Sequence, residues 1–183
     1  MELFLVYSAN NSWLSKIIKY YTKEHYNHVS LSLTKDLNTT YSFGRKELSN
    51  PFIGGFVKED LWNPFFLNSD CSIYSITVTP EQYNQLEQRL HYFHHNQQAY
   101  RYNFLGLLAL SMDVDFERGH AYFCSEFVAT LLQESNIISM DKKAQFVKPL
   151  DLIHNQQFQH IFEGKMVDYL TQESYTETNV SYN

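Results

Sequence analysis

Polar and apolar residues alternate strictly between residues 27 and 33, which predicts a half-buried β-strand. The apolar positions of this segment are expected to pack on the core, so its polar positions share the other face. Those polar positions are His28, Ser30 and Ser32. The pattern therefore brings an imidazole and two hydroxyl groups to one surface of the predicted sheet.

A second alternating segment, Thr39–Phe43, follows a polar turn around Asp36 and predicts a β-hairpin with the first segment. In this hairpin Ser42 lies opposite Ser30 and is a diagonal neighbour of His28. A polar side chain beside an imidazole can fix the orientation of the ring, which a histidine needs when it serves as a general base. Ser42 is therefore a candidate partner of His28.

An amphipathic helix is predicted directly after the aromatic run that ends at residue 123. Its apolar positions recur at helical spacing, and they are Phe127, Val128, Leu131 and Leu132. Cys124 then falls in the first turn, where unpaired backbone N–H groups and the helix dipole stabilise an anion and lower the pKa of a thiol. Because a thiolate is a nucleophile, Cys124 is the candidate catalytic residue. The alternative is that it serves as a small buried apolar side chain.

The same patterns predict further elements along the chain. They are a strand over residues 1–7, a helix over residues 12–21, a strand over residues 71–78 and a helix from Thr79 to His95. Thr79 can cap the last of these helices, and the proline that follows it is favourable in a first turn. The polar segment over residues 171–183 is expected to be loosely held.

A long segment over residues 45–69 contains proline, glycine and many aromatic residues. Segments of this length inside a compact domain are usually functional or contain an element of their own. One interpretation is an aromatic lid over a cleft. We favour the other, a meander whose aromatic side chains fill the core.

Composition narrows the possible function classes. The 183 residues suit one domain, and 14 basic against 20 acidic residues give a net charge of −6. This balance argues against nucleic acid or an anionic membrane surface as the main partner. The longest apolar run, residues 104–110, is far below the roughly 18 residues needed to span a bilayer, so stable membrane insertion is not expected. Two cysteines and no pattern of a secretory signal predict a cytoplasmic protein without disulfides.

Two polar clusters have the residue types of metal sites without the full pattern. The histidines at positions 91, 94 and 95 share a helical face, but no carboxylate completes the set. The acids at positions 113, 115 and 117 resemble the opening of a calcium loop, whose glycine and terminal acid are missing in register. We therefore expect no metal and no cofactor.

In the order His28, Ser42 and Cys124 the chain resembles the circularly permuted branch of the papain-like NlpC superfamily. This branch includes bacterial cysteine peptidase-like proteins and the lecithin retinol acyltransferase group. Its members carry the histidine at the start of a strand, a polar residue on the next strand and the cysteine at the head of a later helix. Further matching segments are residues 12–21, 102–106 and 148–152. The resemblance covers roughly residues 1–155.

This resemblance implies an α+β fold in which helices flank an antiparallel sheet and the cysteine helix packs on the strand of His28. We expect a single permuted papain-like domain over residues 1–170, followed by a polar tail over residues 171–183. The relatives usually carry a histidine or an acid at the third position of the site. Here Ser42 occupies that position, and Thr40 is an alternative on the same face.

The activity that the resemblance implies is acyl transfer through a covalent acyl-enzyme. Cys124 would attack a carbonyl as a thiolate, His28 would act as general base and then as general acid, and Ser42 would orient the ring. The backbone N–H of Cys124 would stabilise the oxyanion. We expect a peptide or amide substrate. Two alternatives remain, a lipid acyl hydrolase or acyltransferase with the same site, and a binding module that uses the fold without turnover.

Overall fold

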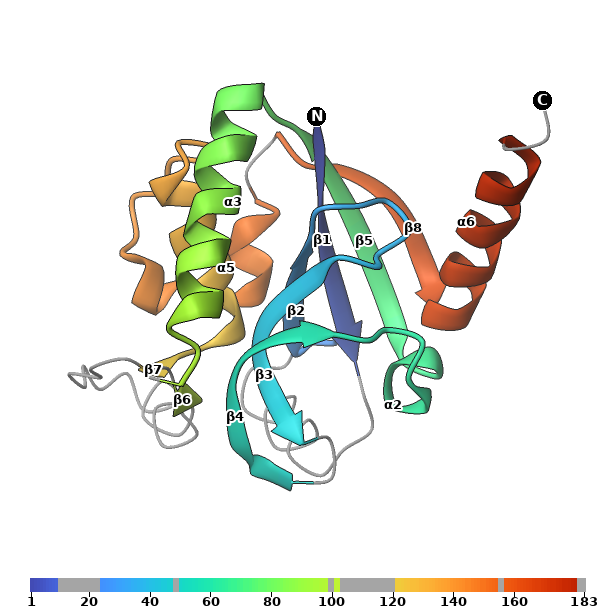
Figure 1. Ribbon diagram of the computed structural model, residues 1–183, viewed down its shortest axis with the longest axis horizontal. Helices are drawn as coiled ribbons and strands as arrows, with labels where there is room; N and C mark the ends of the chain where they lie inside the picture. Colours follow the sequence, from blue (N-terminus) through green and yellow to red (C-terminus); the bar gives the residue numbers. More distant parts are fainter. Residues whose placement is uncertain (10–23, 48–49, 99–100, 103–120, 155–156, 181–183) are drawn as a thin grey trace.

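The computed structural model of the protein describes residues 1–9, 24–47, 50–98, 101–102, 121–154 and 157–180. Within these ranges six strands form an antiparallel sheet in the order β4-β3-β2-β1-β5-β8 (Figure 1). The strands are β1 (Glu2–Ala9), β2 (His28–Ser32), β3 (Thr40–Glu47), β4 (Asn50–Glu59), β5 (Asp70–Thr77) and β8 (Gln159–Lys165). A second, parallel pair consists of β6 (Arg101–Tyr102) and β7 (Ala121–Tyr122).

Helices cover both faces of the large sheet, which confirms the expected α+β class (Figure 1). They are α2 (Pro64–Leu67), α3 (Pro80–His95), α5 (Cys124–Glu134) and α6 (Met166–Val180), with 3₁₀ turns at Ala144–Phe146 and Pro149–Leu152. The predicted helix over residues 12–21 lies outside the described residues. Within the described part of the chain, no helix has the length and apolar character that a membrane crossing requires.

Two apolar clusters form the core, one on each face of the sheet. Alternate residues of β1 belong to different clusters, as expected for a strand that is buried on both sides. Leu3 and Leu5 pack with α3 and α5, whereas Phe4 and Val6 pack with α2 and α6. The sheet is therefore held between two layers of helices, α3 with α5 on one face and α2 with α6 on the other.

The predicted hairpin between β2 and β3 has the expected register. Leu31 pairs with Tyr41 and Ser32 pairs with Thr40, so the same register brings Ser30 opposite Ser42. Local alternation and the length of the turn were sufficient to predict this pairing, because a shift by one residue would turn every side chain to the wrong face.

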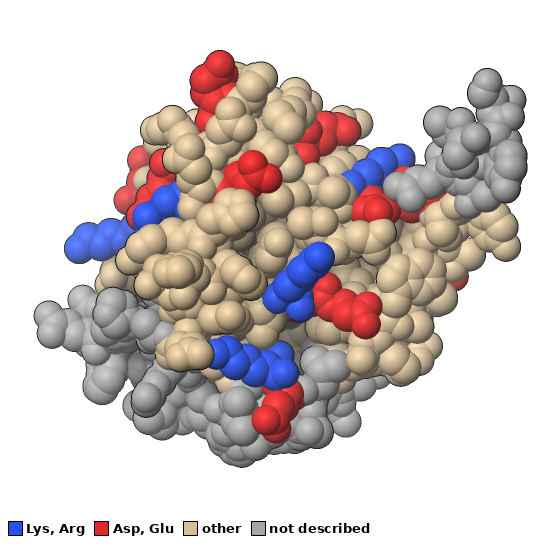
Figure 2. All heavy atoms as spheres, in the orientation of Figure 1, with Lys and Arg blue, Asp and Glu red and all other residues tan. Residues whose placement is uncertain are grey.

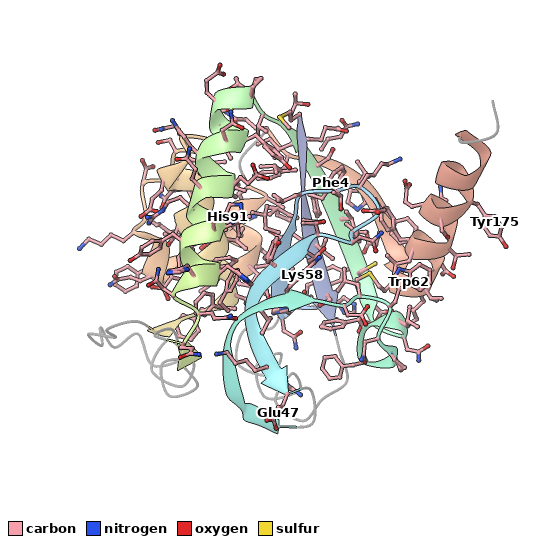
Figure 3. The ribbon with its side chains drawn as sticks, viewed as in Figure 1. Phe4, Glu47, Lys58, Trp62, His91 and Tyr175 are labelled. Atoms are coloured by element: carbon pink, nitrogen blue, oxygen red, sulfur yellow. The ribbon has the colours of Figure 1, made fainter. Side chains whose placement is uncertain are left out.

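The segment over residues 45–69 continues the up-and-down order of β2 and β3, as a meander does. β3 continues to Glu47, β4 pairs with it, and α2 follows. The expectation that its aromatic residues fill the core is confirmed for Phe56 and Phe66, which are 2% and 6% exposed. Trp62 is an exception, because it is 45% exposed and lies beside α2 (Figure 3).

Predictions for the later elements are confirmed in part. Thr79 caps α3 through a reciprocal capping box with Gln82, as its sequence position indicated. The segment from residue 171, expected to be a loose tail, instead continues α6 as far as Val180. The Tyr169 hydroxyl donates to the backbone oxygen of Lys35 at 2.9 Å, and Lys35 forms an ion pair with Glu173. These contacts fasten α6 to the β2–β3 turn.

Candidate functional site

Two residues distant in sequence, His28 and Cys124, meet at one end of the sheet. His28 is the first residue of β2, and Cys124 is the first residue of α5, as the sequence predicted. The two side chains influence each other, because His28 lowers the pKa of the Cys124 thiol and Cys124 raises that of the imidazole. The backbone N–H groups of Val29 and Ser125 also lower the pKa of Cys124.

The first residues of β2 and of α5 act on the same thiol. β2 pairs with β1 as far as His28, whereas its pairing with β3 covers Leu31 and Ser32 at the other end. Near the start of β2 the backbone N–H of Val29 lowers the pKa of Cys124, and so does that of Ser125 in the first turn of α5.

The third member of the site is Glu59, which the sequence analysis did not identify. Glu59 is the last residue of β4, and its Oε1 lies 2.7 Å from Nε2 of His28. Its side chain is 4% exposed, and that of His28 is 16% exposed. A buried carboxylate in contact with an imidazole stabilises the positive charge of the ring far more than a hydroxyl would.

Ser42 and Thr40, the two candidates for the third position, have other partners. Ser42 donates to Oε1 of Glu59 at 2.6 Å, so it reaches His28 through the carboxylate. Thr40 donates to the backbone oxygen of Leu37 at 2.8 Å. Glu59 on β4 therefore lies between Ser42 and the ring, and a role of Ser42 in orienting His28 stays a prediction.

A glycine makes room for this cluster. Gly44, on β3, has no side chain, and a Cβ built there would lie 3.0 Å from Oγ of Ser42, 3.5 Å from Oε1 of Glu59 and 3.6 Å from Cε1 of His28. The strand does not end at this glycine. Its role is to let the hydroxyl, the carboxylate and the imidazole approach one another.

The electrostatics of the site favour an ion pair. Burial acts to lower the pKa of His28, but the charge of Glu59 and the hydrogen bonds to Cys124 and Glu59 raise it to about 10. Burial acts to raise the pKa of Cys124, but the hydrogen bond and charge of His28 lower it overall. The pKa of Glu59 is also lowered, despite burial, by His28 and two serine hydroxyls. All three shifts favour the charged forms of these groups, which are a thiolate, an imidazolium and a carboxylate.

The other cysteine lies in a different environment. Cys71 on β5 is fully buried in the second apolar cluster, and burial together with the charge of Asp70 raises its pKa to about 12. A thiol in this state is neutral and shielded from reagents. We therefore expect Cys71 to be less reactive than Cys124.

The start of α5 is fastened by its own side chains. Oε2 of Glu126 accepts a hydrogen bond from the N–H of Phe123 at 3.2 Å, which confirms that this acid stabilises the helix start. Ser125 donates to the backbone oxygen of Val147 at 2.6 Å. These contacts hold the first turn, and with it Cys124, in a fixed position.

A pocket of about 250 Å³ borders the site at the edge of the sheet. Its lining residues are Asn38, Lys58, Glu59, Asp60, Leu61 and Trp62. Figure 3 labels Lys58 and Trp62, and Figure 2 shows acidic and basic side chains interspersed over the same face. Glu59 therefore lies between His28 and a surface of mixed charge.

Across the described ranges, no group of three or more histidine, cysteine, aspartate or glutamate side chains is placed to hold a metal ion. The side chains of His91, His94 and His95 are exposed along α3.

A register argument could have found Glu59 had β4 been recognised. β3 pairs with β4 so that Thr40 lies opposite Glu59 and Ser42 lies opposite Val57. Glu59 then shares a face with Ser42. The sequence pattern indicated a buried Glu59 only weakly, because an acid between Lys58 and Asp60 is typical of an exposed strand end.

No model of a protein family matches this chain, and no curated protein sequence matches it. The resemblance to the permuted papain-like branch therefore stays a prediction that rests on the order of His28 and Cys124 and on the matching segments around them.

Proposed function

We propose that this chain is a cysteine-dependent hydrolase that cleaves peptide or amide bonds through a covalent acyl-enzyme. The observation that carries this proposal is the contact series from Cys124 through His28 to Glu59. It contains a nucleophile, a base that can take its proton and an acid that stabilises the protonated base. A permuted papain-like arrangement of the fold belongs to the same proposal.

The first chemical step is attack by the thiolate of Cys124 on the substrate carbonyl carbon. The carbonyl electrons move to oxygen, and the backbone N–H of Cys124 at the start of α5 stabilises this oxyanion. The imidazolium of His28 then donates its proton to the leaving amine as the C–N bond breaks. The products of this half-reaction are a free amine and a thioester on Cys124.

The second step releases the acyl group. Neutral His28 removes a proton from a water molecule, whose oxygen attacks the thioester carbon. The C–S bond breaks, the carboxylic acid leaves, and the thiolate with its imidazolium partner is restored. Glu59 stays ionised throughout and stabilises the positive ring whenever it forms.

The protonation state of His28 favours an amide over an ester substrate. An amine leaves a tetrahedral intermediate only after its nitrogen is protonated, whereas an alkoxide leaves more readily without prior protonation. The contact with Glu59 raises the pKa of His28 to about 10, so the ring carries the required proton at neutral pH. The proton that the leaving amine needs is therefore already on the ring, and its transfer is the step that makes amides harder to cleave than esters.

Purified protein should be assayed against short peptides, p-nitrophenyl acyl esters and phospholipid vesicles. We expect amide hydrolysis, an acyl adduct on Cys124 by mass spectrometry, and loss of both in Cys124→Ala. Cys71→Ser is the matched control and should keep the activity, because Cys71 is buried away from His28. Ester cleavage that depends on chain length, without amide cleavage, would replace this proposal with the acyl hydrolase alternative. Failure on every substrate, with an unreactive Cys124, would favour a binding module.

A further inference from the structure

Ser30 contacts both His28 and Glu59, the two residues that form the ion pair beside Cys124. Its hydroxyl donates to Oε2 of Glu59 at 2.5 Å, and the same oxygen lies 3.2 Å from Nε2 of His28. Ser30 is 1% exposed, so water does not compete for these contacts. Hydrogen bonds from a hydroxyl to a carboxylate at about 2.5–2.7 Å are charge-assisted and about twice as strong as neutral ones.

The direction of these hydrogen bonds follows from the number of protons. The Ser30 hydroxyl has one hydrogen, and Oε2 of Glu59, an acceptor, receives it. Toward His28 the oxygen can then only accept. Oε1 of Glu59 also accepts from the ring nitrogen, so both neighbours of Nε2 require it to carry a proton. The other ring nitrogen, Nδ1, is left to exchange a proton with Cys124.

Ser42 completes the arrangement from the adjacent strand. It donates to Oε1 at 2.6 Å, while Ser30 donates to Oε2, so each carboxylate oxygen has its own hydroxyl donor. Two donors from two strands fix the plane of the carboxylate. They also keep it ionised, because a proton on Glu59 would lose these bonds.

We propose that Ser30 is a positioning residue of this site, which holds the carboxylate of Glu59 ionised and in plane with the imidazole and thereby maintains the thiolate of Cys124. This inference rests on the proposed function, and it assigns a role to a residue that does not touch the substrate carbon.

Ser32 is a natural control for this assignment. It lies two residues further along β2 on the same side and is fully buried. Its hydroxyl donates to the backbone oxygens of Thr34 and Thr39. A serine that is merely structural would therefore behave like Ser32.

The test compares two variants of equal shape, Ser30→Thr and Ser30→Val. Both add a branch that suits a strand, but only threonine keeps the hydroxyl. The readout is the rate of iodoacetamide reaction with Cys124 as a function of pH. In Ser30→Val the negative charge beside His28 is weakened, so the pKa of the ring falls and that of the thiol rises. We expect reaction at neutral pH to slow by about tenfold, with the profile displaced upward by about one pH unit. Ser30→Thr and Ser32→Ala should stay near the wild type.

Equal pH profiles for Ser30→Val and Ser30→Thr would overturn the proposal, whatever their melting temperatures. A fall in melting temperature without a displaced profile would likewise assign Ser30 a structural role only. If Ser30→Val does not fold, Ser30→Ala takes its place against Ser32→Ala. Failure of the proposed function is distinguishable, because it would appear in the wild type as a Cys124 whose reactivity does not depend on His28.

Discussion

The carboxylate of Glu59 at the end of β4 lies 2.7 Å from Nε2 of His28 at the start of β2, with β3 between the two strands. Neither residue is the direct strand neighbour of the other. The contact forms because β3 contributes Ser42 and the space at Gly44 on the same face. This ion pair sets the charge of the imidazole and, through it, the ionisation of Cys124.

The first prediction concerns the pH dependence of Cys124. The pKa of His28 is raised to about 10 and that of Cys124 is lowered, so the thiolate is present below the ordinary thiol pKa of about 8.5. Between about pH 6.5 and 8.5 the rate of iodoacetamide reaction should rise less steeply than that of a free thiol, which gains about tenfold per pH unit below its pKa. Stopped-flow measurement against free cysteine checks this. A profile parallel to that of free cysteine would contradict the ion pair.

The second prediction concerns selectivity between the two cysteines. Limited iodoacetamide at neutral pH should label Cys124 and leave Cys71 unmodified, because Cys71 is fully buried and burial raises its pKa to about 12. His28→Ala should slow the labelling of Cys124 by at least about tenfold, because the thiolate then loses its cation. Peptide mapping by mass spectrometry measures both sites. Equal labelling in folded protein would assign Cys124 a structural role.

The third prediction tests Glu59 as the charged partner of His28. Glu59→Gln keeps the shape but removes the charge, so the pKa of His28 should fall and turnover should decrease by roughly 100-fold. Glu173→Gln is a matched control, because Glu173 is a similarly buried carboxylate on α6 that pairs with Lys35 instead of His28. It should lower the melting temperature and leave the labelling rate of Cys124 unchanged. Similar effects of both variants on labelling would refute a special role of Glu59.

The fourth prediction tests the space at Gly44. In Gly44→Ala the new methyl group meets Oγ of Ser42 at 3.0 Å, so the hydroxyl and the carboxylate must move apart. We expect labelling of Cys124 to slow by about tenfold, since one charge-assisted hydrogen bond is weakened. Gly164→Ala on β8 is the control, because its methyl would meet the end of the Phe162 ring at the same distance, far from the site. A Gly44→Ala protein with normal labelling would show that the cluster tolerates the methyl group.

Sequence patterns were sufficient to predict the strand that carries His28 and the helix that carries Cys124. Period-two alternation fixed β2, β3 and their register, since a one-residue shift would have buried the polar face. Helical spacing placed Cys124 at the first residue of α5. These features are local, and each is encoded within a few residues of the side chain that it positions.

The identity of the third residue was decided only by tertiary structure. Whether the acid at position 59 is solvated or buried depends on which strand pairs with β3, and the long segment between them gave no clear alternation. The partner of Ser42 changed for the same reason, from the imidazole to a carboxylate that β4 supplies. A buried charge is stable only when its counter-charge and donors are assembled around it, and for Glu59 on β4 those groups come from two other strands, β2 and β3. The sequence by itself thus determined that His28 and Cys124 lie at the starts of β2 and α5, and the packing of the sheet determined which acid meets the imidazole.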